Sequence, residues 1–263
     1  NFLLDITTYW IREFDIDAWR LDVANEVDHH FWKKFKSACA KEKKDFYILG
    51  EIWHSSQSWL NGDEFDAVMN YAFTDSIIQY LIKKEISLEK MIAELNNQLM
   101  SYRTQTNQVM FNVLDSHDTP RIKTVAGENP DLVKQAMTFM YLHQGVPCLY
   151  YGTEFGLSGA MDPDCRKCMP WDTKDQDLDM FSFCKNLIRF RRDNQEILSE
   201  GKLEWLEVNS ENGLIIFSRS LNGQTITGYF NSGQADIPLI IENPQFAGKY
   251  DGALLQANGY IVK

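Results

Sequence analysis

The spacing of apolar residues divides the chain into alternating helical and extended segments. Six segments show the apolar period of an amphipathic helix, at residues 1–14, 28–43, 73–84, 87–102, 131–143 and 179–192. Five shorter, nearly continuous apolar segments lie between them, at residues 17–23, 46–53, 65–71, 109–118 and 146–152. Continuous apolar strands are typical of parallel sheets that are buried on both faces. Strands that alternate with helices therefore predict an α/β fold with a parallel sheet.

Asp28 is the expected N-cap of the second helical segment. Its carboxylate can accept hydrogen bonds from the free N–H groups of the first turn. Lysines fill the last turn, where cations are favourable beside the helix C-terminus. His29 and His30 follow the cap, and we expect them to have ordinary roles on the helix surface or in packing.

Acidic residues stand at the carboxyl ends of three expected strands, as Asp22, Glu51 and Asp118. Carboxylates gathered at the C-terminal ends of successive parallel strands are typical of the active face of a (β/α)8 TIM barrel. The alternative is a doubly wound sheet, but no glycine-rich phosphate-binding loop follows any strand. Five strands are too few to close a barrel of eight, so we expect the missing strands to precede residue 1.

The pattern changes after about residue 195. Short extended segments alternate there with Asn-Gly, Asn-Ser-Gly and Asp-Gly sequences, which are typical turns of antiparallel hairpins. We therefore expect two domains. Residues 1–195 are predicted to form a partial (β/α)8 barrel, and residues 196–263 a small antiparallel β-sandwich.

Charge and hydropathy argue against two classes of partner. The 263 residues carry a net charge of −11, and an acidic chain lacks the basic face that binds nucleic acid. No apolar run approaches the roughly 20 residues of a membrane-spanning helix. We therefore expect no nucleic-acid partner and no insertion into a membrane.

The five cysteines do not predict a disulfide framework, because their number is odd and the chain is long. Cys165 and Cys168 form a C-x-x-C sequence, but a zinc site needs a second pair of ligands, and the sequence has none. We expect loop cysteines, no metal and a cytoplasmic location. The chain begins inside a helical segment without Met or a signal peptide, so we expect a piece of a longer protein.

Acids at strand ends suit glycoside hydrolysis, in which a retaining enzyme uses one carboxylate as nucleophile and one carboxylic acid as proton donor. Arg20 points to the same side of its strand as Asp22, so it is expected to keep Asp22 charged and to lower its pKa. Apolar neighbours are expected to keep Glu51 protonated, and Gly50 to allow close backbone approach. The residues alone leave another interpretation open, in which each acid is a helix cap or a surface charge.

The segments "DAWRLDVANEVDH", "GEIW" and "VLDSHD", in this order, resemble three sequence blocks of the α-amylase family of glycoside hydrolases. In that family these blocks lie on the fourth, fifth and seventh barrel strands, and "QGVPCLYYGTEFG" resembles its eighth-strand segment. "VANEVDH" and "DPDCRKCMPWD" are similar to the branch that contains cyclomaltodextrinase, neopullulanase and maltogenic amylase. The resemblance covers about residues 1–195 and implies that they are the catalytic barrel from about strand 4 to strand 8.

The resemblance implies a retaining α-glucan hydrolase that acts on cyclodextrins, pullulan or maltooligosaccharides, with transglycosylation as a second outcome. By position, Asp22 matches the nucleophile, Glu51 the general acid/base and Asp118 the transition-state stabiliser. The implied substrate-binding residues are Arg20 beside the nucleophile, His117 on the sugar, and Asn25, Glu26 and Trp53 on the acceptor side.

Two alternative functions stay open: an oligosaccharide α-glucosidase, and a non-catalytic amylase-like subunit that binds a partner. The presence of all three acids argues against the second. The family's first conserved block, three strands and the N-terminal domain that mediates dimers in this branch are absent from the sequence. We therefore expect a poorly active isolated chain, a homodimer only at full length, and no cofactor. The family's structural calcium takes ligands from the absent parts, and the branch often dispenses with it.

Overall fold

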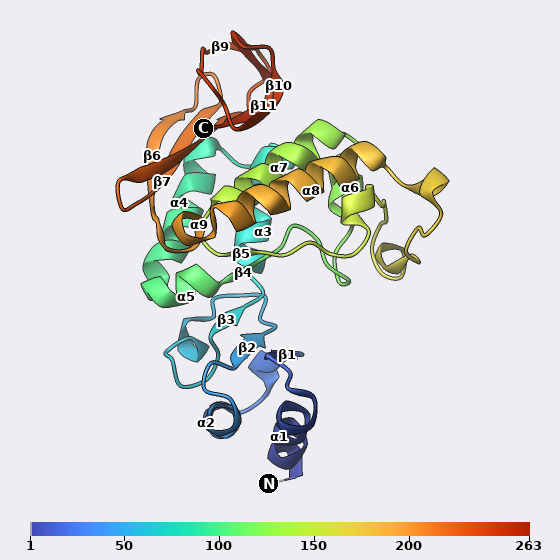
Figure 1. Cartoon of the computed structure of the whole chain (residues 1–263), viewed down its shortest axis with the longest axis vertical. Coiled ribbons are helices and arrows are strands. Elements are labelled where there is room, and N and C mark those ends of the chain that lie inside the picture. The colour runs from blue at the N-terminus through green and yellow to red at the C-terminus, as the bar shows by residue number, and fades with distance from the viewer. Residues whose placement is uncertain (1) are drawn as a thin grey trace.

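The computed structural model describes residues 2–263 and is drawn in Figure 1. Its five parallel strands are β1 (Ala18–Leu21), β2 (Tyr47–Gly50), β3 (Ala67–Val68), β4 (Phe111–Asn112) and β5 (Val146–Pro147). Strands β1, β2 and β3 pair in this order, and β4 pairs with β5. A parallel bridge between Met69 and Phe111 joins the two groups. Neighbouring strands thus follow chain order, and the expected parallel arrangement is confirmed.

The strands are shorter than the apolar segments that contain them. β1 ends at Leu21 and β2 at Gly50, so Asp22 and Glu51 each follow the last paired residue. The difference arises because apolar burial continues after ladder pairing stops, as at Ile52, which is buried outside the strand. The carboxyl edge of the sheet therefore carries expected site residues.

The expected helices are all present. They are α1 (Phe2–Phe14), α2 (His29–Glu42), α3 (Tyr71–Ile77) with its continuation as the π-helix η3 (Ile78–Ile82), α4 (Leu88–Ser101), α7 (Pro130–Leu142) and α8 (Leu178–Asp193). Shorter helices that the pattern did not predict are α5 (Thr104–Val109), α6 (Ile122–Val125) and α9 (Gln195–Glu200), with the 3-10 turns η1 (Ala24–Glu26), η2 (Gln57–Trp59), η4 (Thr153–Phe155), η5 (Asp164–Arg166) and η6 (Thr173–Asp175). One or two turns hold too few apolar positions to show a period. No helix within residues 2–263 combines the length and the apolarity needed to cross a bilayer.

Helix α2 shows how the local sequence sets an element. Asp28 accepts hydrogen bonds from the backbone N–H groups of His30 (2.8 Å) and Phe31 (3.3 Å), which confirms the expected N-cap. The inner face of α2 buries Trp32 and Phe35 in the core around β1, β2 and β3. The cap and this apolar face together fix where α2 begins and which side it turns to the sheet.

Residues 202–262 form an antiparallel sheet, orange to red in Figure 1. Its strands are β6 (Lys202–Asn209), β7 (Leu214–Leu221), β8 (Gln224–Asn231), β9 (Ile237–Pro238), β10 (Phe246–Tyr250) and β11 (Leu254–Val262). The order is β10-β11-β8-β7-β6, with β9 beside β11. The antiparallel pairing was expected, and within residues 2–263 it links all six strands into one connected sheet. The reason is β11, which pairs with β8, β9 and β10 and so joins all the strands.

One face of this sheet packs on the helices around the parallel strands. Phe217 and Phe230 lie against Phe139 of α7, with ring centroids 5.0 and 5.2 Å from it. Arg219 is fully buried and donates a hydrogen bond to the carbonyl oxygen of Leu142 (3.0 Å). Because α7 ends at Leu142, this cation satisfies a carbonyl at the negative end of the helix. The antiparallel sheet and the α/β portion therefore share a core.

Candidate active site

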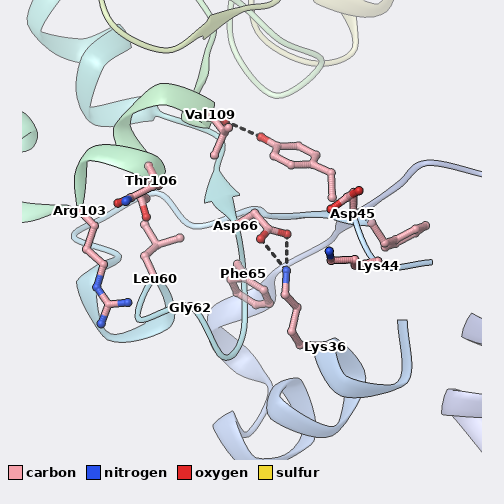
Figure 2. A pocket seen from close by; sticks show the side chains of 13 residues that line it. Lys36, Lys44, Asp45, Leu60, Gly62, Phe65, Asp66, Arg103, Thr106 and Val109 are labelled. Atoms are coloured by element: carbon pink, nitrogen blue, oxygen red, sulfur yellow. Dashed lines mark hydrogen bonds and ion pairs between the residues drawn. The ribbon is translucent and has the colours of Figure 1, made fainter. Parts of the chain in front are cut away.

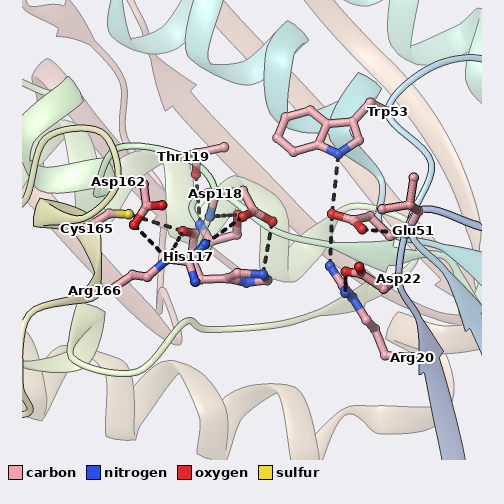
Figure 3. Close-up of polar contacts among 12 residues, drawn as sticks. Arg20, Asp22, Glu51, Trp53, His117, Asp118, Thr119, Asp162, Cys165 and Arg166 are labelled. Atoms are coloured by element: carbon pink, nitrogen blue, oxygen red, sulfur yellow. Dashed lines mark hydrogen bonds and ion pairs between the residues drawn. The ribbon is translucent and has the colours of Figure 1, made fainter.

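Three of the expected site residues meet at the carboxyl ends of β1 and β2. Arg20 donates a hydrogen bond to Asp22 through Nη1, and its Nη2 lies 2.9 Å from Oε1 of Glu51, as Figure 3 shows. Parallel pairing sets Arg20 opposite Leu49, which brings the ends of the two strands together. One guanidinium therefore holds both carboxylates.

Asp22 is held in its ionised form. The hydrogen bond from Arg20 is the main cause of a pKa below the ordinary value for Asp22, and the charge of His117 acts more weakly in the same direction. The lowered pKa that the Arg-x-Asp spacing predicts is thus confirmed. The Asp22 side chain is 75% exposed. An accessible carboxylate that stays charged at neutral pH can act as a nucleophile.

Glu51 is buried, with 7% of its side chain exposed. Its contacts are more polar than expected: Oε2 accepts a hydrogen bond from the Val23 N–H (2.9 Å), and Oε1 accepts one from Nε1 of Trp53 (3.4 Å). The expectation of apolar surroundings was therefore right about burial and wrong about the contacts. The sequence does not show that Arg20 reaches across to the neighbouring strand.

Two backbone features hold Glu51 in place. Val23 has φ 45° and ψ 45°, in the left-handed region that a β-branched residue rarely adopts. Strain of this kind costs on the order of 1–3 kcal/mol and gathers at functional sites, and here it directs the Val23 N–H to Glu51. Gly50 packs on Phe65, since a Cβ at Gly50 would lie 2.7 Å from Cδ2 of Phe65. The expected close backbone approach at Gly50 is confirmed.

Asp118 and His117 form a second group of contacts after β4 (Figure 3). Nε2 of His117 lies 3.0 Å from Oδ2 of Asp118, and Nη2 of Arg166 lies 3.1 Å from Oδ1. Arg166 also donates from Nε to the His117 carbonyl oxygen (2.9 Å) and pairs with Asp162 (3.0 Å). Arg166 was not predicted from the sequence, because the recognisable pattern in its segment is the pair of cysteines and nothing there points to the arginine. The loop that contains those cysteines therefore orients the Asp118 carboxylate.

Trp53 stacks on Tyr71, with ring planes 6° apart and centroids 3.7 Å apart. Trp53 is 48% exposed, and it lines a cavity of about 550 Å³ together with Tyr71. The Tyr71 hydroxyl forms a hydrogen bond with Ser116 (3.1 Å), whose Oγ accepts one from the Asp118 N–H (3.1 Å). Tyr71 was not predicted, although its place at the end of an expected strand was an available signal. The stacked pair offers a flat apolar surface beside Glu51.

Asn25 and Glu26 lie in η1, directly after the turn at Val23. Nδ2 of Asn25 donates a hydrogen bond to Oε1 of Glu26 (2.9 Å). Nε1 of Trp32 donates to the Ala24 carbonyl oxygen (2.9 Å) and so fixes η1 on α2. Within residues 2–263, this pair forms no side-chain hydrogen bond or ion pair with the other six expected site residues. The structure therefore pairs these two side chains with each other, directly after the turn that follows β1.

A buried carboxylate fixes the loop that bears His117 and Asp118. Asp115 accepts hydrogen bonds from the Ile122 N–H (3.0 Å) and from Oγ1 of Thr153 (3.0 Å). Burial raises the pKa of Asp115 to about 6, because desolvation of the charge outweighs these hydrogen bonds. Asp115 was not predicted, since nothing in "VLDSHD" shows which of its two aspartates turns inward.

A cavity of about 600 Å³ lies away from these acids. Its lining includes Asp45 and Asp66, which precede β2 and β3, so it opens at the amino ends of the strands (Figure 2). Nζ of Lys36 lies 2.5 and 2.7 Å from the two carboxylate oxygens of Asp66 there. Residues 2–263 hold no group of three or more His, Cys, Asp or Glu side chains arranged to bind a metal ion.

A parallel sheet with acids at its carboxyl edge, joined to an antiparallel sheet, is the arrangement of a barrel enzyme with carboxylate chemistry. The comparisons with known proteins identify the family. The family described as "Alpha amylase, catalytic domain" matches residues 1–198, so the chain belongs to the α-amylase family. The family that the sequence blocks resemble is therefore confirmed.

The relatives also confirm the branch. The chain is 51% identical over 233 residues to the intracellular maltogenic amylase of Bacillus subtilis (strain 168), covering 89% of this chain and 40% of that protein. It is 43% identical over 244 residues to a cyclomaltodextrinase of Geobacillus thermopakistaniensis (strain MAS1), with coverages of 92% and 41%. A solved cyclomaltodextrinase structure is similar with a TM-score of 0.90 at 38% identity, over 99% of this chain and 47% of that chain. The chain thus spans about two fifths of the length of these curated relatives.

Proposed function

We propose that this chain is part of a retaining α-glucan hydrolase that cleaves α-1,4 or α-1,6 bonds of cyclodextrins, pullulan or maltooligosaccharides. The observation that carries the proposal is the contact of the Arg20 guanidinium with both Asp22 and Glu51. A retaining mechanism needs two carboxyl groups close together, one as nucleophile and one as acid and then base. The names of the relatives, maltogenic amylase and cyclomaltodextrinase, support the substrate class.

In the proposed mechanism, Asp22 attacks the anomeric carbon while Glu51 gives a proton to the departing glycosidic oxygen. Water then attacks the resulting glycosyl-enzyme, and Glu51 takes a proton from that water as Asp22 departs. Bond formation at Asp22 removes its charge. Glu51 is then the one remaining partner of the Arg20 guanidinium in this pair of contacts.

The sugar is proposed to be held on both sides of the cleaved bond. On one side Asp118, oriented by His117 and Arg166, binds hydroxyl groups and stabilises oxocarbenium-like charge. On the acceptor side, Trp53 presents its exposed indole, and Asn25 and Glu26 form the wall of the cleft.

The proposal extends to the architecture of the whole protein. The five parallel strands correspond to strands 4–8 of a (β/α)8 barrel over residues 1–195, and residues 196–263 form the C-terminal β domain. The longer protein is proposed to be cytoplasmic and a homodimer through an N-terminal domain. The name of the B. subtilis relative, an intracellular amylase, supports the location.

Covalent trapping tests the proposal. A fluorinated maltosyl fluoride, which forms the glycosyl-enzyme quickly and releases it slowly, is added to this chain fused behind the preceding segment of the B. subtilis relative. Mass spectrometry of the digested protein is expected to find the sugar on Asp22. Asp17→Asn, at an exposed acid paired with Lys43, should label normally, whereas Asp22→Asn should not. Label on another residue, or products of inverted anomeric configuration, would overturn the proposal.

The acceptor-side role of Glu26 gives a separate prediction. Replacing Glu26 with His removes a negative charge and the acceptor of the Asn25 amide, so the balance between water and sugar as acceptor should shift. The ratio of hydrolysis to transglycosylation products in the fusion protein, measured by chromatography, checks it. Glu13→His on the exposed surface of α1 is the control. An unchanged product ratio in Glu26→His would count against a role for Glu26.

A further inference from the structure

A groove between α1 and α2 has no part in the proposed function. It encloses about 450 Å³, and none of its lining residues belongs to the candidate active site. Leu4 and Thr8 of α1 form one wall, and residues 30–42 of α2 supply the other. The two helices pack together at the N-terminal end of the molecule (Figure 1).

The α2 wall of the groove carries one stripe of polar side chains. His30, Lys34, Ser37 and Lys41 are four, three and four residues apart, so they share one face of the helix. All four are exposed, and within residues 2–263 none of their side chains forms a hydrogen bond or an ion pair. At about 1.5 Å of rise per residue, the stripe is about 16 Å long. We call these four residues the donor stripe.

The groove lies in a basic part of an acidic chain. Residues 29–44 contain six lysines and one glutamate, whereas the whole chain carries a net charge of −11. Three of the lysines are neutralised by acids, in the pairs Lys33–Asp63, Lys36–Asp66 and Lys43 with Asp15 and Asp17. The one acid of the groove, Glu42, is paired with Arg12 (3.0 Å). Lys34 and Lys41 therefore give the groove a net positive charge.

The cavity at the amino ends of the strands does not specify a charge in the same way. Arg103 lies on one side of it and Lys44 on the other, and Asp45 lies on the same side as Lys44 (Figure 2). The Lys36–Asp66 pair adds one charge of each sign. Mixed charges of this kind favour no class of ion, whereas Lys34 and Lys41 of the donor stripe favour anions.

We propose that the groove between α1 and α2 binds an extended acidic segment of a partner protein. Alternate side chains of an extended peptide point to one side about 6.7 Å apart. The rise from His30 to Lys34, and again from Ser37 to Lys41, is about 6 Å. Three carboxylates at alternate positions of five extended residues span about 13 Å and therefore fit within the length of the donor stripe. A compact anion such as phosphate reaches only one such pair.

The affinity follows from exposed charge pairs. Each contact between an exposed lysine and a carboxylate changes the dissociation constant by about fivefold at most. Because these pairs are solvent-exposed, salt screens them strongly. The groove therefore suits a transient, salt-sensitive partner.

The experiment uses this chain and a fluorescein-labelled decapeptide of alternating Glu and Ser, with fluorescence anisotropy as readout at low ionic strength. The parent should bind it, and Lys34→Gln combined with Lys41→Gln should weaken binding about tenfold. The matched control combines Lys185→Gln and Lys202→Gln, two exposed lysines outside the groove, and should change binding less than twofold. A decapeptide of five Glu followed by five Ser, with equal charge, should bind more weakly than the alternating peptide.

Three results would overturn the proposal. The first is equal binding by the groove variant and the control variant, once circular dichroism shows that both are folded. The second is equal binding of the two decapeptides, which would mean that spacing plays no part. The third is tighter binding of tripolyphosphate, or of vesicles with phosphatidylglycerol, than of the alternating peptide, which would assign the groove to a compact anion or a membrane surface.

Discussion

Arg20 is the residue on which the ionisation of Asp22 depends. Replacing Arg20 with Met keeps an unbranched side chain but removes the hydrogen bond that is the main cause of the lowered pKa. The pKa of Asp22 is therefore expected to rise toward its ordinary value. Carbon NMR of the Asp22 carboxyl group, titrated in this chain, measures the change. Arg12→Met, which breaks an exposed pair with Glu42, should leave the Asp22 titration as it is. An unshifted Asp22 in Arg20→Met would contradict the assignment.

Asp115 links stability to pH through burial. Its pKa is raised from 3.8 to about 6 in the folded protein. Its contribution is therefore full below about pH 4 and is lost as the pH rises through about 6, where the folded protein must hold a buried charge. A shift of about two units corresponds to about 3 kcal/mol. Asp115→Asn has no proton to lose, so its stability relative to the parent should rise by up to about 3 kcal/mol between pH 4 and 7.5.

Urea unfolding followed by circular dichroism at about pH 4 and pH 7.5 checks this prediction. Asp251 supplies a control of opposite sign, because hydrogen bonds from the N–H groups of Ala253 and Leu254 lower its pKa. Because Asp251 titrates below its ordinary value of 3.8, the stability difference between Asp251→Asn and the parent should stay nearly the same at pH 4 and pH 7.5. Parallel pH profiles for the two variants would refute the buried-charge explanation for Asp115.

At the residue scale, the sequence predicts contacts within one strand better than contacts between loops. Arg20 and Asp22 are two residues apart, so strand alternation alone puts them together. Arg166 lies 48 residues beyond Asp118 in a loop without a period, and only folding brings the two together. Tyr71 was likewise missed, because it follows β3, whereas its hydrogen-bond partner Ser116 lies 45 residues later, after β4.

At the scale of elements, the apolar pattern predicts that a strand exists better than where it ends. β3 and β4 pair over two residues each, although their apolar segments are longer. Burial sets the pattern in both the ladder and the loop that follows, and the sequence does not distinguish them. Helix starts were easier to predict than strand ends, because a cap is a property of one residue and its immediate neighbours.

The cap of α2 gives a prediction for an element. Asp28→Ala removes the acceptor for two backbone N–H groups and should lower the free energy of unfolding by about 1 kcal/mol. Asp28→Asn keeps a capping oxygen without the charge and should lose much less. Urea unfolding of both variants measures the difference. Equal losses would show that the carboxylate charge, and not the capping geometry, stabilises α2.

At the scale of the whole molecule, the shared core explains why the C-terminal sheet could be predicted only in outline. Turn sequences such as Asn-Gly mark hairpins locally, and the antiparallel pairing followed from them. Which strands β11 joins, and that one sheet face packs on α7, depend on contacts between segments far apart in sequence. Buried Arg219 is part of that junction, and no local pattern shows that an arginine is buried.

The candidate site is open on the side of β1. Within residues 2–263, β1 pairs with β2 alone, so its other edge carries unpaired backbone groups. The outer face of α1 is apolar and exposed at Phe2 and Phe14. Asp22, at the end of β1, faces solvent, and a charge in water polarises a reacting bond much less than a charge in a closed site. The chain spans about two fifths of the length of its curated relatives.

Efficient hydrolysis is therefore expected only when further strands cover β1. We predict that the isolated chain hydrolyses β-cyclodextrin at least about 100-fold more slowly than the fusion behind the preceding segment of the B. subtilis enzyme, because a misplaced or solvated catalytic group costs that much. Initial rates of reducing-sugar release, at equal concentrations of folded protein, measure the ratio. The fusion with Asp22→Asn should return to the low rate, which would show that the acid of this chain performs the reaction in the restored barrel. Comparable rates for the isolated chain and the fusion would mean that the exposed site is already complete. That result would contradict the prediction that further strands are required.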